Sequence, residues 1–278
     1  MNPLTHKGIA LLVVALCFGV LSCATTTITP DMVHMVQKNL TVAIPERDGK
    51  FPVVIFYQGT GGGNRRAEKW ASWFKTLGVA SAIVDNAGIR NRTTNPARSM
   101  YTEDAAIAWD LLKTHPRIDT SRFALMGFSR GGQQALEAGP HFTGERAAPT
   151  FVFALYPGGW GPDRCRSTYG RPTQVHIFFG DLDDVGRDEG YSHACSGLAR
   201  GRDPVEFHEL KGATHGYDDV FSYTFTYGRA RIARVEPNPD AVERTKSIIA
   251  KAIRARWGLW HEGQGAHRVV ACGSSPSS

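Results

Sequence analysis

Six short apolar runs constrain the fold of this chain more than any other feature of its sequence. Each run is four to seven residues long and rich in β-branched and aromatic side chains, and most runs lack polar alternation. Such runs are typical of strands that are buried on both faces. They lie at Phe51–Tyr57, Ala80–Val84, Phe123–Met126, Phe151–Leu155, Val175–Phe179 and Val205–Leu210.

Helix-forming stretches lie between the runs, so that strand and helix alternate along the chain. These stretches are Ala67–Leu77, Thr102–Leu112, Gly132–Ala138 and Asp240–Trp257. The alternation predicts an α/β fold with a mostly parallel central sheet that is flanked by helices on both faces. In such a sheet ligands bind beyond the carboxyl ends of the strands, so we expect functional residues directly after the strands.

Composition and charge narrow the class of protein further. The chain has 278 residues, of which 42% are hydrophobic, and no linker-like stretch divides it. We expect one domain over residues 39–257, with an N-terminal segment over 24–38 and a loosely ordered Gly- and Ser-rich tail over 258–278. The net charge of +6 is spread along the chain. Because no nucleic-acid-binding motif accompanies it, we expect no nucleic-acid partner.

The first 23 residues are typical of a signal peptide. Lys7 precedes an apolar run, Ile9–Leu21, that is too short to span a bilayer. The segment Val20–Cys23 is similar to a bacterial lipobox, which predicts lipidation of Cys23 and a membrane anchor. Ordinary cleavage near Ala24 is the alternative and would release a soluble protein. In both cases we expect export to the bacterial periplasm or envelope.

A candidate nucleophile follows the third apolar run. The segment Gly127-Phe128-Ser129-Arg130-Gly131 comes directly after the strand Phe123–Met126, and a helix is predicted from Gly132. This is the strand-turn-helix setting of a nucleophile elbow, in which the glycines allow a very tight turn. Ser129 is therefore the predicted nucleophile. The alternative is a serine that only caps the helix.

A serine hydroxyl needs a base within hydrogen-bond reach, and a histidine in a loop after a late strand would serve. The chain has ten histidines. His176 and His208 lie within predicted strands, whereas His215 follows the strand Val205–Leu210 in a loop flanked by glycines. His215 is therefore the predicted base.

The third member of a triad must be a carboxylate that orients the imidazole. Asp181, Asp183 and Asp184 all follow the strand Val175–Phe179. The resulting order of serine, aspartate and histidine is that of α/β-hydrolases. Position along the chain does not choose among the three carboxylates.

Cleavage through a tetrahedral intermediate also needs N–H donors for the developing oxyanion. The backbone N–H of Arg130, directly after the nucleophile, is one candidate. The glycine-rich loop after the first strand, Gln58–Gly63, supplies a second, with Thr60 as the first choice and Gly61 as the next.

With these residues placed, the chain resembles the dienelactone hydrolase family of α/β-hydrolases over roughly Asn39–Trp257. The motifs that carry the resemblance are Gly127–Gly132, Phe179–Asp184 and Gly212–Asp218. In that family the acid is typically the third residue after the glycine that closes the strand, so the resemblance implies Asp183. The founding members use a cysteine nucleophile, and a serine at this position implies a broader esterase-like role.

The resemblance also bears on the cysteines. Cys165 and Cys195 flank one predicted strand, and the pair is similar to what exported relatives carry. We expect a disulfide bond between them, with two unpaired buried thiols as the alternative.

The expected activity is hydrolysis of a small-molecule ester or lactone through an acyl-enzyme. Trp160, Tyr217, Arg90 and Arg92 are candidates for the substrate pocket, the arginines as partners of a substrate carboxylate. The sequence has no metal motif of the HExxH or paired-cysteine kind and no dinucleotide fingerprint, so we expect no metal and no cofactor. A peptidase or an acyltransferase would use the same triad, and a non-catalytic envelope lipoprotein could retain the fold for binding.

Overall fold

The computed structural model describes residues 27–60, 65–85, 89, 101–158, 168–170, 172–188, 205–228 and 230–259. The predicted signal peptide with Cys23, most of the predicted tail, and both Cys165 and Cys195 lie outside these residues. None of the helices in the described part of the chain combines the length and the apolar character that crossing a bilayer requires.

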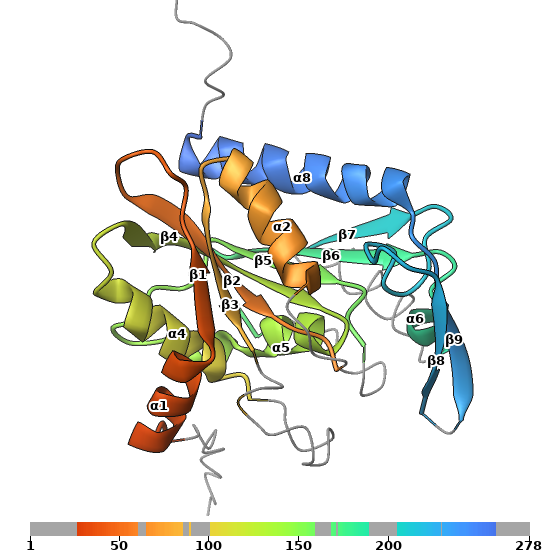
Figure 1. Ribbon diagram of the computed structural model, residues 1–278, viewed down its shortest axis with the longest axis horizontal. Coiled ribbons are helices and arrows are strands. Elements are labelled where there is room, and N and C mark those ends of the chain that lie inside the picture. The colour runs from red at the N-terminus through yellow and green to blue at the C-terminus, as the bar shows by residue number, and fades with distance from the viewer. Residues whose placement is uncertain are drawn as a thin grey trace, which may run out of the picture.

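A seven-stranded sheet forms the centre of the protein (Figure 1). Its strand order is β1-β3-β2-β4-β5-β6-β7, and every neighbouring pair is parallel except β1 and β3. All six predicted strands are present, and the mostly parallel sheet confirms the predicted fold class. The strands are β1 (Leu40–Ala43), β2 (Phe51–Tyr57), β3 (Ala80–Val84), β4 (Ile118–Phe128), β5 (Phe151–Leu155), β6 (Gln174–Gly180) and β7 (Val205–Leu210).

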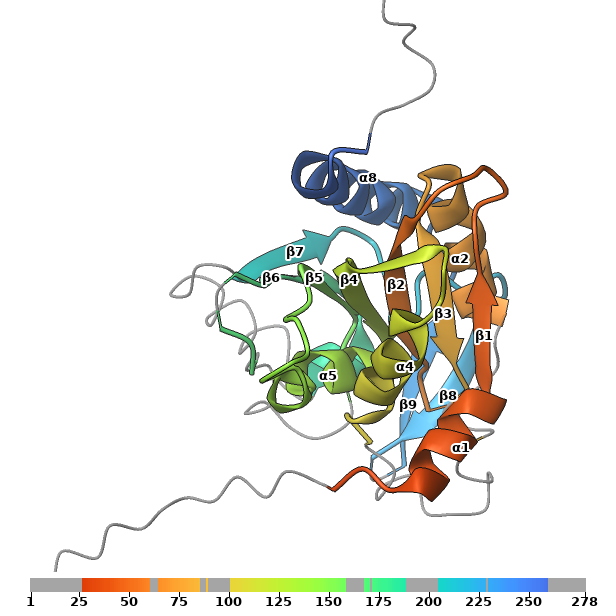
Figure 2. The ribbon, with the colours of Figure 1, turned by 90° about the vertical axis from the view of Figure 1, so that its left-hand side faces the viewer.

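Helices cover both faces of the sheet, as Figures 1 and 2 show. On one face lie α2 (Arg65–Thr76) and α8 (Pro239–Trp257). On the other lie α4 (Asp104–Lys113) and α5 (Arg130–Glu137), the latter followed by a short 3₁₀ helix, η2 (Gly139–His141). Every residue of β2, β3 and β5 is buried, which explains why these strands lack polar alternation.

Local sequence signals set the two ends of α8. The side chain of Asn238 accepts a hydrogen bond from the N–H of Ala241 at 3.0 Å, and Pro239 occupies the first helical position. Gly258 ends the helix in the left-handed conformation, with φ of 65°.

The structure adds elements that the sequence analysis does not predict. α1 (Pro30–Lys38), within the predicted N-terminal segment, packs against α4 and buries Val36 completely. After β7, the strands β8 (Tyr223–Tyr227) and β9 (Arg231–Val235) form an antiparallel hairpin. The short helix α6 (Asp184–Asp188) contacts β9. The hairpin strands are short and largely exposed, so they lack the apolar pattern that marks the sheet strands.

The N-terminal end of α5 packs very close to the sheet. A Cβ added at Gly131 would collide with the backbone carbonyl oxygens of Tyr57 and Gln58 at the end of β2. A Cβ added at Gly127 would collide with the carbonyl oxygen of Gly131. Both positions therefore require glycine, and the close approach fixes the point at which β4 turns into α5.

We predict that Gly131→Ala destabilises the protein, because the backbone of β2 cannot move away without disturbing the middle of the sheet. The expected loss is about 1–3 kcal/mol, measured by urea or thermal unfolding. Gly170→Ala is the matched control, since no heavy atom lies within 4 Å of a Cβ there. It should change stability by less than about 0.5 kcal/mol. Equal stabilities of the two variants would contradict the close packing at Gly131.

Candidate active site

Ser129 stands between β4 and α5 in a backbone conformation that is uncommon for residues other than glycine. Its φ is 52° and its ψ is −118°. Residues with a Cβ rarely adopt such angles, and when they do, the strain is often found at functional sites. The N–H of Ser129 donates to the carbonyl oxygen of Leu155 at 2.9 Å, and its own carbonyl oxygen accepts the N–H of Gly158 at 3.2 Å. These bonds hold the turn, which has the geometry predicted for a nucleophile elbow.

His215 lies in the loop that follows β7. The flanking Gly212 and Gly216 have φ values of 71° and 68°, which lets the chain turn sharply on both sides of the histidine. Nε2 of His215 lies 2.8 Å from Oγ of Ser129. The structure thus brings the predicted base within hydrogen-bond distance of the predicted nucleophile.

Asp183 is the carboxylate that reaches the imidazole. Its Oδ1 and Oδ2 lie 3.0 and 3.1 Å from Nδ1 of His215. Asp181 instead accepts the N–H of Gly212 at 2.6 Å. Asp184 begins α6 and faces the guanidinium of Arg234 at 4.0 Å. Of the three candidate acids, only Asp183 contacts the histidine.

The acid and the base of this group of side chains are both deeply buried. His215 and Asp183 have exposed fractions of only 4% and 1%. Oδ1 of Asp183 also accepts the backbone N–H of Gly186 at 2.9 Å, which helps to satisfy the buried carboxylate. With a carboxylate against Nδ1, the proton of the neutral imidazole lies on Nδ1. Nε2 is then able to accept the hydrogen of the Ser129 hydroxyl.

Direct backbone contacts hold the loops that carry Asp183 and His215 side by side. The N–H of Leu182 donates to the carbonyl oxygen of Ala213 at 3.0 Å. Gly180, the last residue of β6, lies so close to Ala213 that an added Cβ would collide with it. Because β6 and β7 are parallel neighbours, the acid and the base emerge at the same edge of the sheet.

Several solved structures have a similar overall fold. A dienelactone hydrolase-like promiscuous phosphotriesterase from metagenomic libraries is 21% identical, with a TM-score of 0.59 over 80% of this chain and 92% of that chain. An acetyl ester-xyloside bifunctional hydrolase from Caldicellulosiruptor lactoaceticus is 17% identical, with a TM-score of 0.56 over 80% and 89%. A thermophilic esterase from the Planctomycetes species Thermogutta terrifontis is 16% identical, with a TM-score of 0.55 over 81% and 90%. This chain has the α/β-hydrolase fold.

The likeness to these structures establishes the α/β-hydrolase fold and agrees, at the level of the fold, with the resemblance to dienelactone hydrolases seen in the sequence. No protein-family model and no curated protein matches the chain. A fold hosts many activities, so the chemistry of this protein is inferred from its site.

Two of the predicted oxyanion donors, Arg130 and Thr60, belong to segments that lie near Ser129. Arg130 is the first residue of α5, where backbone N–H groups point out of the helix end and the helix dipole favours negative charge. Gly59 and Thr60, in the loop after β2, line the pocket. A Cβ added at Gly59 would lie 3.6 Å from Cβ of Ser129, so the loop after β2 closely approaches the nucleophile. Gly61 lies outside the described residues.

A pocket of about 900 Å³ opens over Ser129 and His215. Its lining comes from the loop after β2, from α2, from the ends of β4 and β5, from the loop after β7 and from the β8–β9 hairpin. The ring of Phe225 in the hairpin lies 5.7 Å from the imidazole of His215. The hairpin, which the sequence analysis missed, therefore forms a wall beside the base. A volume of this size is typical of small-molecule sites, which span about 300–1,000 Å³.

A buried carboxylate, Asp218, organises the wall behind His215. It accepts hydrogen bonds from Nε1 of Trp70 at 2.7 Å and from the hydroxyl of Tyr156 at 2.6 Å. Nε of Arg66 lies 3.2 Å from the same carboxylate. The ring of Tyr156 meets the imidazole of His215 edge-on, with 4.9 Å between centroids. Asp218 thus fixes the ring of Tyr156, which contacts the base. The sequence does not show this role, because the partners of Asp218 lie on α2 and after β5, far away in the chain.

The prediction that Tyr217 lines the pocket is wrong. Its side chain is completely buried, and its hydroxyl pairs with that of Thr245 in α8 at 2.8 Å. Tyr156, which the sequence analysis did not single out, lines the pocket instead, and the ring of Tyr217 packs edge-on behind it at 5.4 Å. Burial raises the pKa of both tyrosines well above the ordinary value, so both hydroxyls stay protonated.

Other predicted site residues lie outside the described part of the chain, and their roles stay predictions. They are the pocket candidates Trp160, Arg90 and Arg92, the disulfide candidates Cys165 and Cys195, and the lipidation candidate Cys23.

We predict that Asp218→Asn lowers the free energy of unfolding by about 1–3 kcal/mol, because the amide cannot accept hydrogen bonds from all three donors and leaves buried donors of Trp70 or Tyr156 unsatisfied. Asp219→Asn is the matched control. Its carboxylate pairs with the same Arg66 at 2.6 Å but is partly exposed, with a side-chain exposed fraction of 15%. The control should lose less than about 1 kcal/mol in denaturant unfolding. An equal loss of unfolding free energy in both variants would show that the burial of Asp218 does not determine its contribution to stability.

Proposed function

We propose that this protein is a serine hydrolase that cleaves an ester-like or lactone bond of a small molecule through an acyl-enzyme. In this proposal Ser129 is the nucleophile, His215 is the base and Asp183 is the acid that orients the imidazole. The observation that carries the proposal is the continuous line of contacts from Asp183 through His215 to Oγ of Ser129. The acid and the base in this line are buried, and the nucleophile lines the pocket.

In the first half of the reaction, Oγ of Ser129 attacks the carbonyl carbon of the ester while Nε2 of His215 takes the hydroxyl proton. The new C–O bond turns the carbonyl oxygen into an oxyanion. Asp183 stabilises the imidazolium through Nδ1–H. When the tetrahedral intermediate collapses, Nε2 gives its proton to the leaving alcohol oxygen, and an ester of Ser129 remains.

In the second half, water attacks the acyl-enzyme and loses a proton to Nε2 of His215. Collapse of the second tetrahedral intermediate releases the carboxylic acid, and Oγ of Ser129 regains the proton from the imidazolium. In both halves the backbone N–H of Arg130 and a donor from the loop containing Gly59 and Thr60 stabilise the oxyanion. Arg130 directly follows Ser129 at the start of α5, and a Cβ at Gly59 would lie 3.6 Å from Cβ of Ser129, which supports this role.

The lining of the pocket supports a small-molecule substrate. Phe128, Phe225 and Val235 offer apolar surface to an acyl or alcohol group. Two of the solved structures with the same fold are named as an esterase and an acetyl ester-xyloside hydrolase. These names support ester hydrolysis as the reaction class. Substrate profiling would identify the acyl group.

We predict that the mature protein hydrolyses p-nitrophenyl acetate and butyrate and that Ser129→Ala lowers kcat/KM by at least about 10³-fold, because the nucleophile is lost. A fluorophosphonate should add one adduct to the wild type, detected by intact mass, and none to Ser129→Ala. Ser72→Ala, which removes a hydroxyl on the exposed side of α2, is the control and should behave as wild type. If the wild type is neither labelled nor active, a binding protein that retains the fold becomes the better interpretation.

A second prediction separates the three candidate acids. Asp183→Asn should lower kcat by about 10²–10⁴-fold, because an amide facing Nδ1 favours the wrong tautomer of His215. Asp184→Asn removes a neighbouring carboxylate that does not contact the imidazole and should stay within about threefold of wild type. Steady-state kinetics with p-nitrophenyl butyrate compares them. A larger loss in Asp184→Asn than in Asp183→Asn would reassign the acid.

A further inference from the structure

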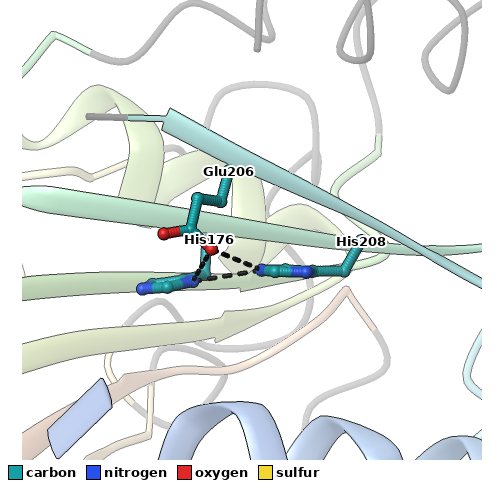
Figure 3. A group of neighbouring side chains, drawn as sticks. All are labelled: His176, Glu206 and His208. Carbon is teal, nitrogen blue, oxygen red and sulfur yellow. Dashed lines mark hydrogen bonds and ion pairs between the residues drawn. The ribbon is translucent and has the colours of Figure 1, made fainter. Parts of the chain in front are cut away.

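A cluster of side chains that can bind a metal ion lies on β6 and β7, away from the candidate active site. Figure 3 shows His176 from β6 and Glu206 and His208 from β7 pointing toward one another, on the side of the sheet that α8 covers. The triad residues follow the carboxyl ends of their strands. The cluster instead lies within the strands, several residues earlier in the chain than Asp183 and His215.

The strand register explains why these three side chains meet. β6 and β7 pair in parallel, with His176 opposite Glu206 and Phe178 opposite His208. Side chains two residues apart on a strand point to the same face. Glu206 therefore lies directly across from His176, and His208 lies diagonally across from it, on the same face of the sheet. The first histidine is far from the other two residues in the sequence, so no motif marks the group.

The distances within the cluster suit a small divalent ion. Nδ1 of His176 lies 3.1 Å from Nε2 of His208, and Oε2 of Glu206 lies 3.7 Å from each of these nitrogens. A triangle with these sides has a central point about 2.0 Å from all three atoms. Zinc lies about 2.0–2.2 Å from histidine nitrogens and carboxylate oxygens in proteins.

The chemistry of the three groups agrees with the distances. Two imidazole nitrogens and one carboxylate form a donor set that suits zinc and similar transition-metal ions. His176 is almost completely buried, whereas the Glu206 side chain is 62% exposed, so an ion would have a path from solvent and room for a water ligand.

We propose that His176, Glu206 and His208 form a binding site for a divalent transition-metal ion of the Zn²⁺ class, with three protein ligands and one position open to water. The site goes beyond the proposed hydrolase activity and does not depend on it. β7 is the last strand in the order of the sheet, and β6 is the only strand with which it pairs in the described part of the chain. An ion bound by both strands therefore ties this edge strand, which leads into the loop of His215, to the rest of the sheet.

The test uses the mature protein without a histidine tag. The protein is treated with EDTA and then dialysed. Titration with ZnCl₂ in a calorimeter should show one strong site per chain. Zinc at about 100-fold above its Kd should raise the Tm by about 5 °C or more, because the ion binds only the folded state. Mg²⁺, which prefers oxygen ligands, should not change the Tm. Absence of zinc binding would overturn the proposal.

Three variants show whether the ion binds at this cluster. His208→Gln retains a side chain that can hydrogen-bond to His176 but removes a ligand, and Glu206→Gln removes the charge with little change in shape. Both should weaken zinc binding by at least about 100-fold, while their Tm values in EDTA stay close to that of wild type. His34→Gln removes an exposed histidine on α1 and should bind zinc as the wild type does. Wild-type zinc affinity in His208→Gln would place the ion on other residues and overturn the proposal.

Discussion

The close contact between the start of α5 and the end of β2 is the constraint on which the candidate site depends. Because Gly131 has no side chain, the helix backbone rests against the carbonyl oxygens at the end of β2. The chain passes from β4 into α5 through a single residue. That residue is Ser129, and its positive φ is the local result of the tight turn. Hydrogen bonds to Leu155 and Gly158 then tie the turn to the end of β5. The nucleophile is thus held by two neighbouring strands and not by its own loop alone.

Around this turn, the site is built from buried polar groups whose partners come from distant elements. Asp218 joins α2, the end of β5 and the loop of the predicted base through Arg66, Tyr156 and Trp70. Buried charges add little net stability when they are paired, but they tolerate few alternative arrangements. The network therefore holds the ring of Tyr156 against His215, while the hairpin residue Phe225 also lies beside the imidazole.

The likeness to solved structures defines the fold of the protein but not its substrate. The solved structures with this fold are named for phosphotriester, acetyl ester-xyloside and ester substrates, so a shared sheet does not select one bond. In this chain the pocket lining from α2 and from the β8–β9 hairpin lies outside the central sheet, and such additions are where specificity can differ between proteins that share a core. The cluster of His176, Glu206 and His208 is a further feature of the sheet itself that the triad chemistry does not use.

The sequence by itself predicted six strands of the sheet, most of them because strands buried on both faces require continuous apolar runs. It also placed Ser129 and His215 in tight turns, because such turns need glycines at set positions. Position along the chain left three carboxylates as candidates and only the family resemblance implied Asp183, since their distance from the imidazole depends on how the loop after β6 packs against Ala213. Tertiary structure alone decided that Tyr156 faces the pocket and Tyr217 does not, that a hairpin walls the base, and that two histidines and a glutamate converge. Those outcomes rest on contacts between elements distant in the chain, which no local pattern encodes.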